Sequence, residues 1–324
     1  MINTIRYSVV VPAFNEEPVI EETYKRLKKV MDEIGEPYEL VFVNDGSSDQ
    51  TGEILERIHC VDPHLKAIHF SRNFGHEAAT TAGLDHTSGQ GIIIIDADLQ
   101  DPPEIIPEMI EKWKQGYEIV YGKRKQRKGE SALKKTTSAL FYRFLQRMTE
   151  IDMPADVGDF RLIDRKVCDA LKHMREKNRY MRGIISWVGF RQTAIEFVRE
   201  ERWAGETKYN LKKLLRLAWD AITAFSYKPL KIATYLGFTL SGISFIYLVV
   251  VIFEKLFTQK TVPGWASIMV INLFFNGVVL IMLGLLGEYI GRIYEETKNR
   301  PLYIIHKTQG FQSTPSNYEE SPHS

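Results

Sequence analysis

Four consecutive isoleucines, followed by three aspartates within six residues, most strongly constrain how this chain can fold. An apolar run of this length, residues 92–95, predicts a short strand buried on both faces, as strands of a parallel sheet are. Pro102 and Pro103 then stand where a helix would begin, and Glu104 suits its first turn. Because open α/β sheets bind ligands at the carboxyl ends of their strands, the aspartates are expected to face a ligand.

Asp96 and Asp98 are separated by one residue and can share a hard divalent cation. Mg²⁺ or Mn²⁺ prefers one or two carboxylates together with phosphate oxygens of a bound substrate. The pair therefore predicts a nucleotide diphosphate held through a metal. A strand end with solubilising acids is the alternative, because an Asp-x-Asp pair alone is common. The position directly after the isoleucine strand favours the metal site.

Strand-like and helix-like segments alternate over residues 7–121. The apolar runs that predict strands are residues 7–13, 38–43, 65–70, 92–95 and 117–121. The segments with helical spacing are residues 18–34, 51–58, 77–84 and 103–115. Strands separated by helices predict an α/β fold with a doubly wound parallel sheet.

Polar residues that could bind a ligand also follow each of the first three strands. Residues 44–49, Asn-Asp-Gly-Ser-Ser-Asp, could simply turn the chain and cap a helix, or could hold a nucleoside through a carboxylate. Residues 12–17 and 71–76 stand at the ends of the neighbouring strands, and the latter offer a cation and a flexible glycine. The convergence of these segments with Asp96 and Asp98 at one sheet edge favours a binding site.

The order and spacing of these segments resemble glycosyltransferase family 2. The matching motifs are residues 9–16 (VVVPAFNE), 44–49 (NDGSSD), 71–75 (SRNFG) and 96–103 (DADLQDPP). That family has the GT-A fold, a doubly wound and mostly parallel sheet, and inverts configuration at the anomeric carbon. Residues 158–162 (GDFRL) and two C-terminal hydrophobic segments are similar, more narrowly, to the polyprenyl-phosphate glycosyltransferases, which include bactoprenol glucosyltransferases and dolichol-phosphate mannose synthases.

The resemblance implies a role for individual residues. It puts Asp45 at the nucleoside, Asp159 as the candidate base, and Mg²⁺ or Mn²⁺ at the diphosphate. The residues expected to bind the nucleotide sugar are Pro12, Asn15, Glu16, Asp45, Arg72, Asp96 and Asp98. The expected metal ligands are Asp96, Asp98 and Gln100.

A dense basic run at residues 123–128 is either a solvated loop, the usual role of such runs, or a contact for phosphate. Residues 203–208 form a loop that ends in a basic residue and could close over an acceptor phosphate or act as a connector. The expected contacts of the acceptor phosphate are Lys123, Arg124, Arg127, Arg161, Arg202 and Lys208.

The C-terminal third predicts a membrane attachment. Residues 232–253 and 261–287 contain no charged residue, and crossing ~30 Å of hydrocarbon takes about 20 residues. The basic amphipathic segment before them, residues 209–225, is typical of a helix that lies in the membrane interface. Lys and Arg flank the outer ends of the two spans, so the positive-inside rule puts the catalytic domain and tail on the cytoplasmic side of the cell membrane. Glycine and serine residues spaced four apart offer close-packing faces, for the helix pair itself or for a homo-oligomer.

We therefore expect four parts. Residues 1–206 form the cytoplasmic GT-A catalytic domain, 207–228 the amphipathic interface helix, 229–290 a domain of two transmembrane helices, and 291–324 a cytoplasmic tail. The tail is polar after Gly310 and is expected to be disordered.

Charge and cysteine content narrow the class of partner. The 42 basic and 41 acidic residues nearly cancel, so no global signal for nucleic-acid binding exists. Cys60 and Cys168 form no disulfide framework, which fits a reduced cytosolic setting. A strand begins close to the first residue, so we expect no signal peptide.

The predicted function is transfer of a sugar from a nucleotide sugar, a UDP-glucose or other UDP-hexose, to polyprenyl phosphate. Inversion would give a β-linked product on the cytoplasmic leaflet, for cell-envelope glycosylation after a separate flippase. One alternative is a processive polysaccharide synthase of the same fold, but its Gln-x-x-Arg-Trp motif is incomplete, since Arg199 stands at the first position before Arg202. The other alternative is a non-enzymatic nucleotide-binding membrane scaffold, against which the intact aspartates argue.

Overall fold

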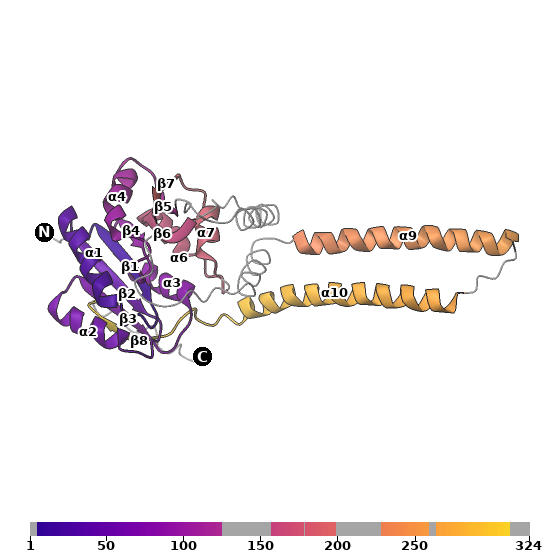
Figure 1. Ribbon diagram of the computed structural model, residues 1–324, viewed down its shortest axis with the longest axis horizontal. Helices are drawn as coiled ribbons and strands as arrows, with labels where there is room; N and C mark the ends of the chain where they lie inside the picture. Colours follow the sequence, from indigo (N-terminus) through magenta and orange to yellow (C-terminus); the bar gives the residue numbers. More distant parts are fainter. Residues whose placement is uncertain (1–4, 125–156, 178, 199–227, 259–263, 312–324) are drawn as a thin grey trace, which may run out of the picture. The chain divides into compact units, whose positions relative to one another are not determined.

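A computed structural model of the chain describes residues 5–124, 157–177, 179–198, 228–258 and 264–311 (Figure 1). The chain divides into two compact units. The first comprises Met1–Tyr142, Ile151–Asn210 and Pro301–Ser324, and the second Arg143–Glu150 and Leu211–Arg300. The first unit contains an α/β sheet, and the second contains two long helices.

The sheet of the first unit has eight strands in the order β7-β5-β6-β4-β1-β2-β3-β8. β1 pairs in parallel with both β2 and β4, and β2 pairs in parallel with β3. β6 runs antiparallel to β4 and β5, and β8 runs antiparallel to β3, so the sheet is mixed. The strands are β1 Tyr7–Ala13, β2 Tyr38–Asn44, β3 Leu65–Phe70, β4 Gly91–Ile94, β5 Ile119–Arg124, β6 Val157–Asp164, β7 Gln192–Phe197 and β8 Ile305–Gln309. The predicted α/β class and the first five strands are confirmed.

Helices cover both faces of this sheet. The helices are α1 Ile20–Ile34, α2 Thr51–Val61, α3 His76–His86, the 3₁₀ turn η1 Pro103–Ile105, α4 Ile106–Lys114, α6 Arg165–Lys172 and α7 Met181–Trp187. Apolar residues of α1, α2 and α4 pack with one face of β1 and β2, and those of α3 pack with the other face. α3 approaches β1 closely, since a Cβ added at Gly83 would clash with a methyl of Val10.

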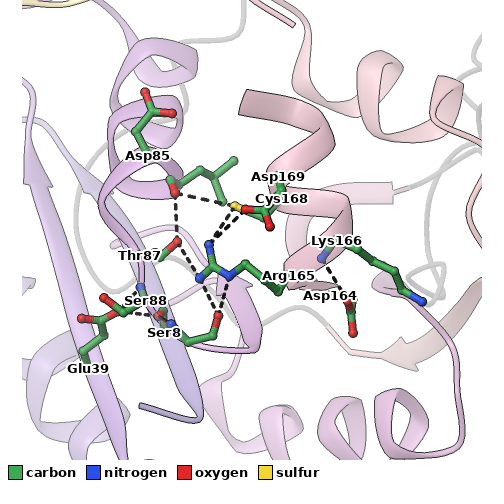
Figure 2. Close-up of polar contacts among 12 residues, drawn as sticks. Ser8, Glu39, Asp85, Thr87, Ser88, Asp164, Arg165, Lys166, Cys168 and Asp169 are labelled. Atoms are coloured by element: carbon green, nitrogen blue, oxygen red, sulfur yellow. Dashed lines mark hydrogen bonds and ion pairs between the residues drawn. The ribbon is translucent and has the colours of Figure 1, made fainter. Parts of the chain in front are cut away.

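A buried hydrogen-bond network ties the amino ends of the central strands together. The Glu39 carboxylate, 1% exposed, accepts hydrogen bonds from the Ser8 hydroxyl (2.5 Å) and the Ser88 amide (2.7 Å) and pairs with Lys66 (2.6 Å). Figure 2 shows the network continuing to Arg165, whose guanidinium donates to the carbonyl of Gly89. These contacts fix the turn that leads into β4, and hence the position of the aspartates at its other end.

The second unit contains α9, Lys228–Thr258, and α10, Trp265–Thr297, which contact each other side by side (Figure 1). By length and composition only, both are able to cross a membrane, over Lys228–Tyr247 and Phe274–Thr297. The predicted interface helix at residues 209–225 lies outside the described residues.

Strand β8 is a feature that no pattern in the sequence predicted. It lies within residues 291–324, which we expected to be a tail, and it extends the sheet at the edge of β3. Its sequence, Ile-His-Lys-Thr-Gln, has little apolar alternation because pairing at an edge depends mainly on the backbone.

The Glu39 network yields a prediction about stability. Glu39→Ala leaves Lys66, the buried Ser8 hydroxyl and the Ser88 amide without their acceptor, so we expect the free energy of unfolding to fall by about 3 kcal/mol. Thermal unfolding of the full-length protein in detergent should show a midpoint lower by roughly 6–12 °C. Glu21→Ala is the control, because Glu21 is an exposed acid of α1 that pairs with Lys25. Equal midpoints for the two variants would contradict the proposed importance of the network.

Candidate active site

A cavity of about 410 Å³ opens where β1, β2 and β4 end and α3 begins. Each of these three strands supplies lining residues at its carboxyl end, as parallel pairing requires. The lining residues are Pro12, Ala13, Phe14, Glu16, Asp45, Asn73, Gly75, His76, Ala79, Asp96, Ala97 and Asp98. The cavity therefore brings together five of the seven residues predicted to bind the nucleotide sugar: Pro12, Glu16, Asp45, Asp96 and Asp98.

The sixth, Asn15, joins the two loops that form one wall of the cavity. Its amide donates to the hydroxyl of Ser47 (3.0 Å), and its side-chain oxygen accepts from the amide of Ser48 (2.8 Å). Its φ of 55° lies in the left-handed region, which asparagine tolerates better than most residues. Asn15 thus supports the wall by linking the β1–α1 loop to the β2–α2 loop.

Asp45 organises the loop between β3 and α3. Its carboxylate, in a side chain only 2% exposed, accepts from the amides of Phe74 (2.7 Å) and Gly75 (2.9 Å) and from the Asn73 side chain (2.9 Å). Burial raises the pKa of Asp45, and the two backbone donors oppose that rise. A carboxylate offers about four acceptor positions, so three internal hydrogen bonds leave room for one from a ligand.

Arg72, the seventh residue, lies outside the cavity lining. Its guanidinium carbon is 4.0 Å from the centre of the Phe74 ring, and its side chain donates to the Asn73 carbonyl (2.8 Å). The side chain is exposed, so these contacts hold the cation beside the loop that Asp45 clamps.

The predicted metal ligands stand directly after β4. Asp96 Oδ1 is buried and accepts no hydrogen bond from any described residue, while Asp98 accepts from the amide of Gln100 (3.1 Å). Burial raises the pKa of Asp96 to about 6; His76 opposes this shift, and the neighbouring acids reinforce it. A buried carboxylate oxygen without a donor fits a site for a cation, because such a group is otherwise costly to bury.

Asp159, the candidate base, is held by an arginine that we did not assign from sequence. Arg182 of α7 donates from Nε to Oδ1 (2.7 Å) and from Nη2 to Oδ2 (2.6 Å) of Asp159 on β6. Burial alone would raise the pKa of Asp159, but Arg182, with Arg161, lowers it below the usual range of a carboxyl. The paired carboxylate is therefore kept ionised.

His76 connects the two acidic groups. Its Nε2 lies 3.6 Å from Asp96 and 3.8 Å from Asp159, and these three side chains could together hold a metal ion. No histidine was assigned a role from the sequence, so this neighbourhood was missed. Its only signal was the position of His76 directly after the motif at residues 71–75.

The cations predicted to meet an acceptor phosphate lie in different surroundings. Arg161 is 3% exposed and donates to the carbonyls of Gly158 (2.8 Å) and Asp159 (3.3 Å), so it supports its own strand instead of facing solvent. Lys123 is exposed, with its Nζ 3.8 Å from Glu196. The side chain of Arg124 and all of Arg127, Arg202 and Lys208 lie outside the described residues.

Comparisons with known proteins cover nearly the whole chain. A family model described as glycosyl transferase family 2 matches residues 8–172, and a model of the GtrB C-terminal hairpin matches residues 228–293. The uncharacterized glycosyltransferase YkcC of Bacillus subtilis (strain 168) is 60% identical over 313 residues, 97% of this chain and 97% of that protein. The bactoprenol glucosyl transferase of Shigella phage SfII is 45% identical over 304 residues, 94% of this chain and 98% of that protein.

Solved structures resemble the chain more distantly. The glucosyl-3-phosphoglycerate synthase of Mycobacterium tuberculosis, in complex with Mn²⁺, UDP and glucosyl-3-phosphoglycerate, matches 68% of this chain and 78% of that chain. The TM-score is 0.47 and the sequence identity 17%.

The raised pKa of Asp96 yields a prediction about metal binding. A cation binds the deprotonated carboxylate, so below about pH 6 a proton competes for the same oxygen. We expect the affinity of the full-length protein for Mn²⁺, measured by electron paramagnetic resonance, to fall about tenfold per pH unit below that value. Asp96→Asn should weaken binding at pH 7.5, whereas Asp169→Asn, an exposed acid on α6, should not. Unchanged Mn²⁺ affinity in Asp96→Asn would remove Asp96 from the ligand set.

Proposed function

The chain belongs to glycosyltransferase family 2, and from that premise we propose that it transfers a sugar from a nucleotide sugar to polyprenyl phosphate. A phosphate oxygen of the acceptor forms a bond to the anomeric carbon, and the bond from that carbon to the nucleoside diphosphate breaks. The donor is a UDP-hexose such as UDP-glucose, and the single displacement inverts the anomeric configuration. The names of relatives that are 45% identical over 94% of the chain, bactoprenol glucosyl transferases, support this acceptor.

One observation carries the proposal: a cavity at the strand ends contains a carboxylate oxygen, Asp96 Oδ1, that is buried and accepts no hydrogen bond from the described residues, beside a carboxylate held by an arginine. Asp96 and Asp159 offer ligand atoms within 4.8 Å of each other, yet only Asp159 has an arginine as its partner. A divalent cation held by Asp96 and Asp98, with Gln100 beside them, would neutralise the charge that develops on the leaving diphosphate. Asp45 and the loops joined by Asn15 would hold the nucleoside at the far side of the cavity.

The ionisation of the acceptor phosphate explains why Asp159 need not act as a strong base. A phosphate monoester has a second pKa of about 6, so near neutral pH the nucleophile is already mostly a dianion. A strong base is then unnecessary, which agrees with a carboxyl whose pKa Arg182 lowers. We assign Asp159 to orienting the acceptor, while Arg182 offsets the repulsion between the carboxylate and the phosphate.

The two long helices, α9 and α10, indicate where in the cell the reaction takes place. A polyprenyl phosphate presents its headgroup at a membrane surface, and α9 and α10 are both able to span a bilayer by length and composition. We propose that they anchor the first unit at the cytoplasmic face of the cell membrane, where nucleotide sugars are available.

A substrate screen tests this function. Full-length protein, undecaprenyl phosphate, Mg²⁺ or Mn²⁺ and a panel of UDP- and GDP-hexoses should yield a lipid product whose mass equals polyprenyl phosphate plus one hexose. Asp98→Asn should make no product while retaining the thermal unfolding midpoint of the wild type. Sugar incorporated into a polymer would support a processive synthase instead, and absence of turnover with every donor would contradict an enzymatic role.

Arg182 provides a second test of the site. Arg182→Gln removes both donors from Asp159, so we expect turnover to fall at least about tenfold through the misplaced carboxylate. The control is Arg26→Gln, which breaks a similar two-bond pair with Glu104 on the surface (3.0 and 2.7 Å). Steady-state rates with saturating donor should separate the two variants. Similar rates for both would show that the ion pair contributes nothing to catalysis.

A further inference from the structure

Residues 303–309 follow α10 in the sequence, yet they contact Phe70 and His69, which support two of the loops around the cavity, the β3–α3 loop and the β2–α2 loop. α10 ends at Thr297, and the chain then returns to the sheet of the first unit as β8. We propose that this returning segment is a positioning element for the donor nucleotide, acting through Tyr303 and Gln309. The inference rests on the proposed function only in placing a nucleotide in the cavity.

The segment lies directly against the end of β3. β8 pairs antiparallel with β3, with Gln309 opposite Ala67 and Ile305 opposite Phe70. Beyond the paired residues, the amide of Ser71 donates to the carbonyl of Ile304 (3.0 Å). The returning segment therefore holds Ser71, the first residue of the β3–α3 loop. The same loop contains the three groups that donate hydrogen bonds to Asp45.

Tyr303 begins one line of contacts into the cavity. Its ring stacks on Phe70 with centroids 5.1 Å apart and planes 9° apart, and Phe70 meets Phe74 edge to face at 5.7 Å. The amide of Phe74 donates to Asp45 (2.7 Å), which lines the cavity. The Tyr303 hydroxyl points elsewhere and donates to Asp85 (2.7 Å). The ring, not the hydroxyl, thus contacts the support of Asp45.

Gln309 begins a second series of contacts, and the direction of each hydrogen bond in it can be assigned. The Ser47 amide donates to Asn44 Oδ1 (3.0 Å), so the Asn44 amide nitrogen is the donor to His69 Nδ1 (3.2 Å). His69 Nε2 then carries the proton and donates to Gln309 Oε1 (3.2 Å). Burial lowers the pKa of His69, which favours the neutral ring that this chain of donors needs.

The two lines reach different walls of one cavity. The first reaches Asp45 and the β3–α3 loop, and the second reaches Ser47, whose hydroxyl accepts from the amide of Asn15 in the β1–α1 loop. Loops ordered before a ligand arrives lose less conformational freedom when it binds, and affinity rises accordingly. Loss of the contacts from residues 303–309 should therefore weaken nucleotide binding and leave the binding of the acceptor unchanged.

The test is UDP binding to the full-length protein with Mn²⁺, by isothermal titration calorimetry in detergent. Tyr303→Ala should weaken UDP binding roughly 5- to 10-fold, the effect of about one further group to be ordered on binding. Tyr303→Phe keeps the ring and should bind within about twofold of wild type. Thr308→Ala is the matched control, since Thr308 lies on the same strand and its side chain is exposed.

Kinetics separate positioning from simple stability. In Tyr303→Ala the KM for the nucleotide sugar should rise while the KM for polyprenyl phosphate stays unchanged. Gln309→Leu, which deprives the His69 Nε2–H of its acceptor, should also weaken UDP binding and decides the matter if Tyr303→Ala yields little folded protein. UDP affinity equal to wild type in the folded variants would overturn this inference alone. Failure of the wild type to bind UDP would overturn the donor assignment, and this inference with it.

Discussion

Parallel pairing of four buried strands is the constraint on which the rest of this structure depends. β1 lies between β2 and β4, and all three strands run in the same direction. The residues that follow them therefore meet at the carboxyl ends of the strands. At the amino ends of the same strands, the Glu39 carboxylate accepts hydrogen bonds from Ser8 and Ser88 and pairs with Lys66, which holds the strands together. The cavity is thus a consequence of strand direction, and its chemistry depends on which side chains follow each strand.

Two half-buried acids at the cavity, Asp159 and Asp96, are compensated by positive charge in opposite ways. Asp159 obtains two hydrogen bonds from Arg182 and keeps its charge, with its pKa lowered. Asp96 has no hydrogen-bond donor at Oδ1 among the described residues, and its pKa is raised. The first arrangement suits a group that orients a substrate, and the second suits a ligand for a cation that comes with a substrate. Adjacent carboxylates with such different surroundings can take separate roles in one reaction.

Features could be predicted from the sequence where the residues that form them are close together along the chain. The isoleucine strand, its aspartates and the motifs after β1, β2 and β3 are local patterns, and the structure brings most of them together. Arg182 pairs with an acid 23 residues away, and Gln309 with a histidine 240 residues away, so no local spacing reveals either contact. The burial of Arg161 could not be predicted for a related reason: its charge is visible in the sequence, whereas its packing against its own strand is not.

The central claim is a single direct displacement at the cavity, and the anomeric configuration of the lipid product tests it most directly. With UDP-α-glucose as donor, nuclear magnetic resonance of the purified product should show the large H1–H2 coupling of a β-linked glucosyl phosphate. An α-linked product would mean retention of configuration, and would contradict direct attack by the acceptor phosphate at a site organised by Asp96, Asp98 and the Asp159–Arg182 pair.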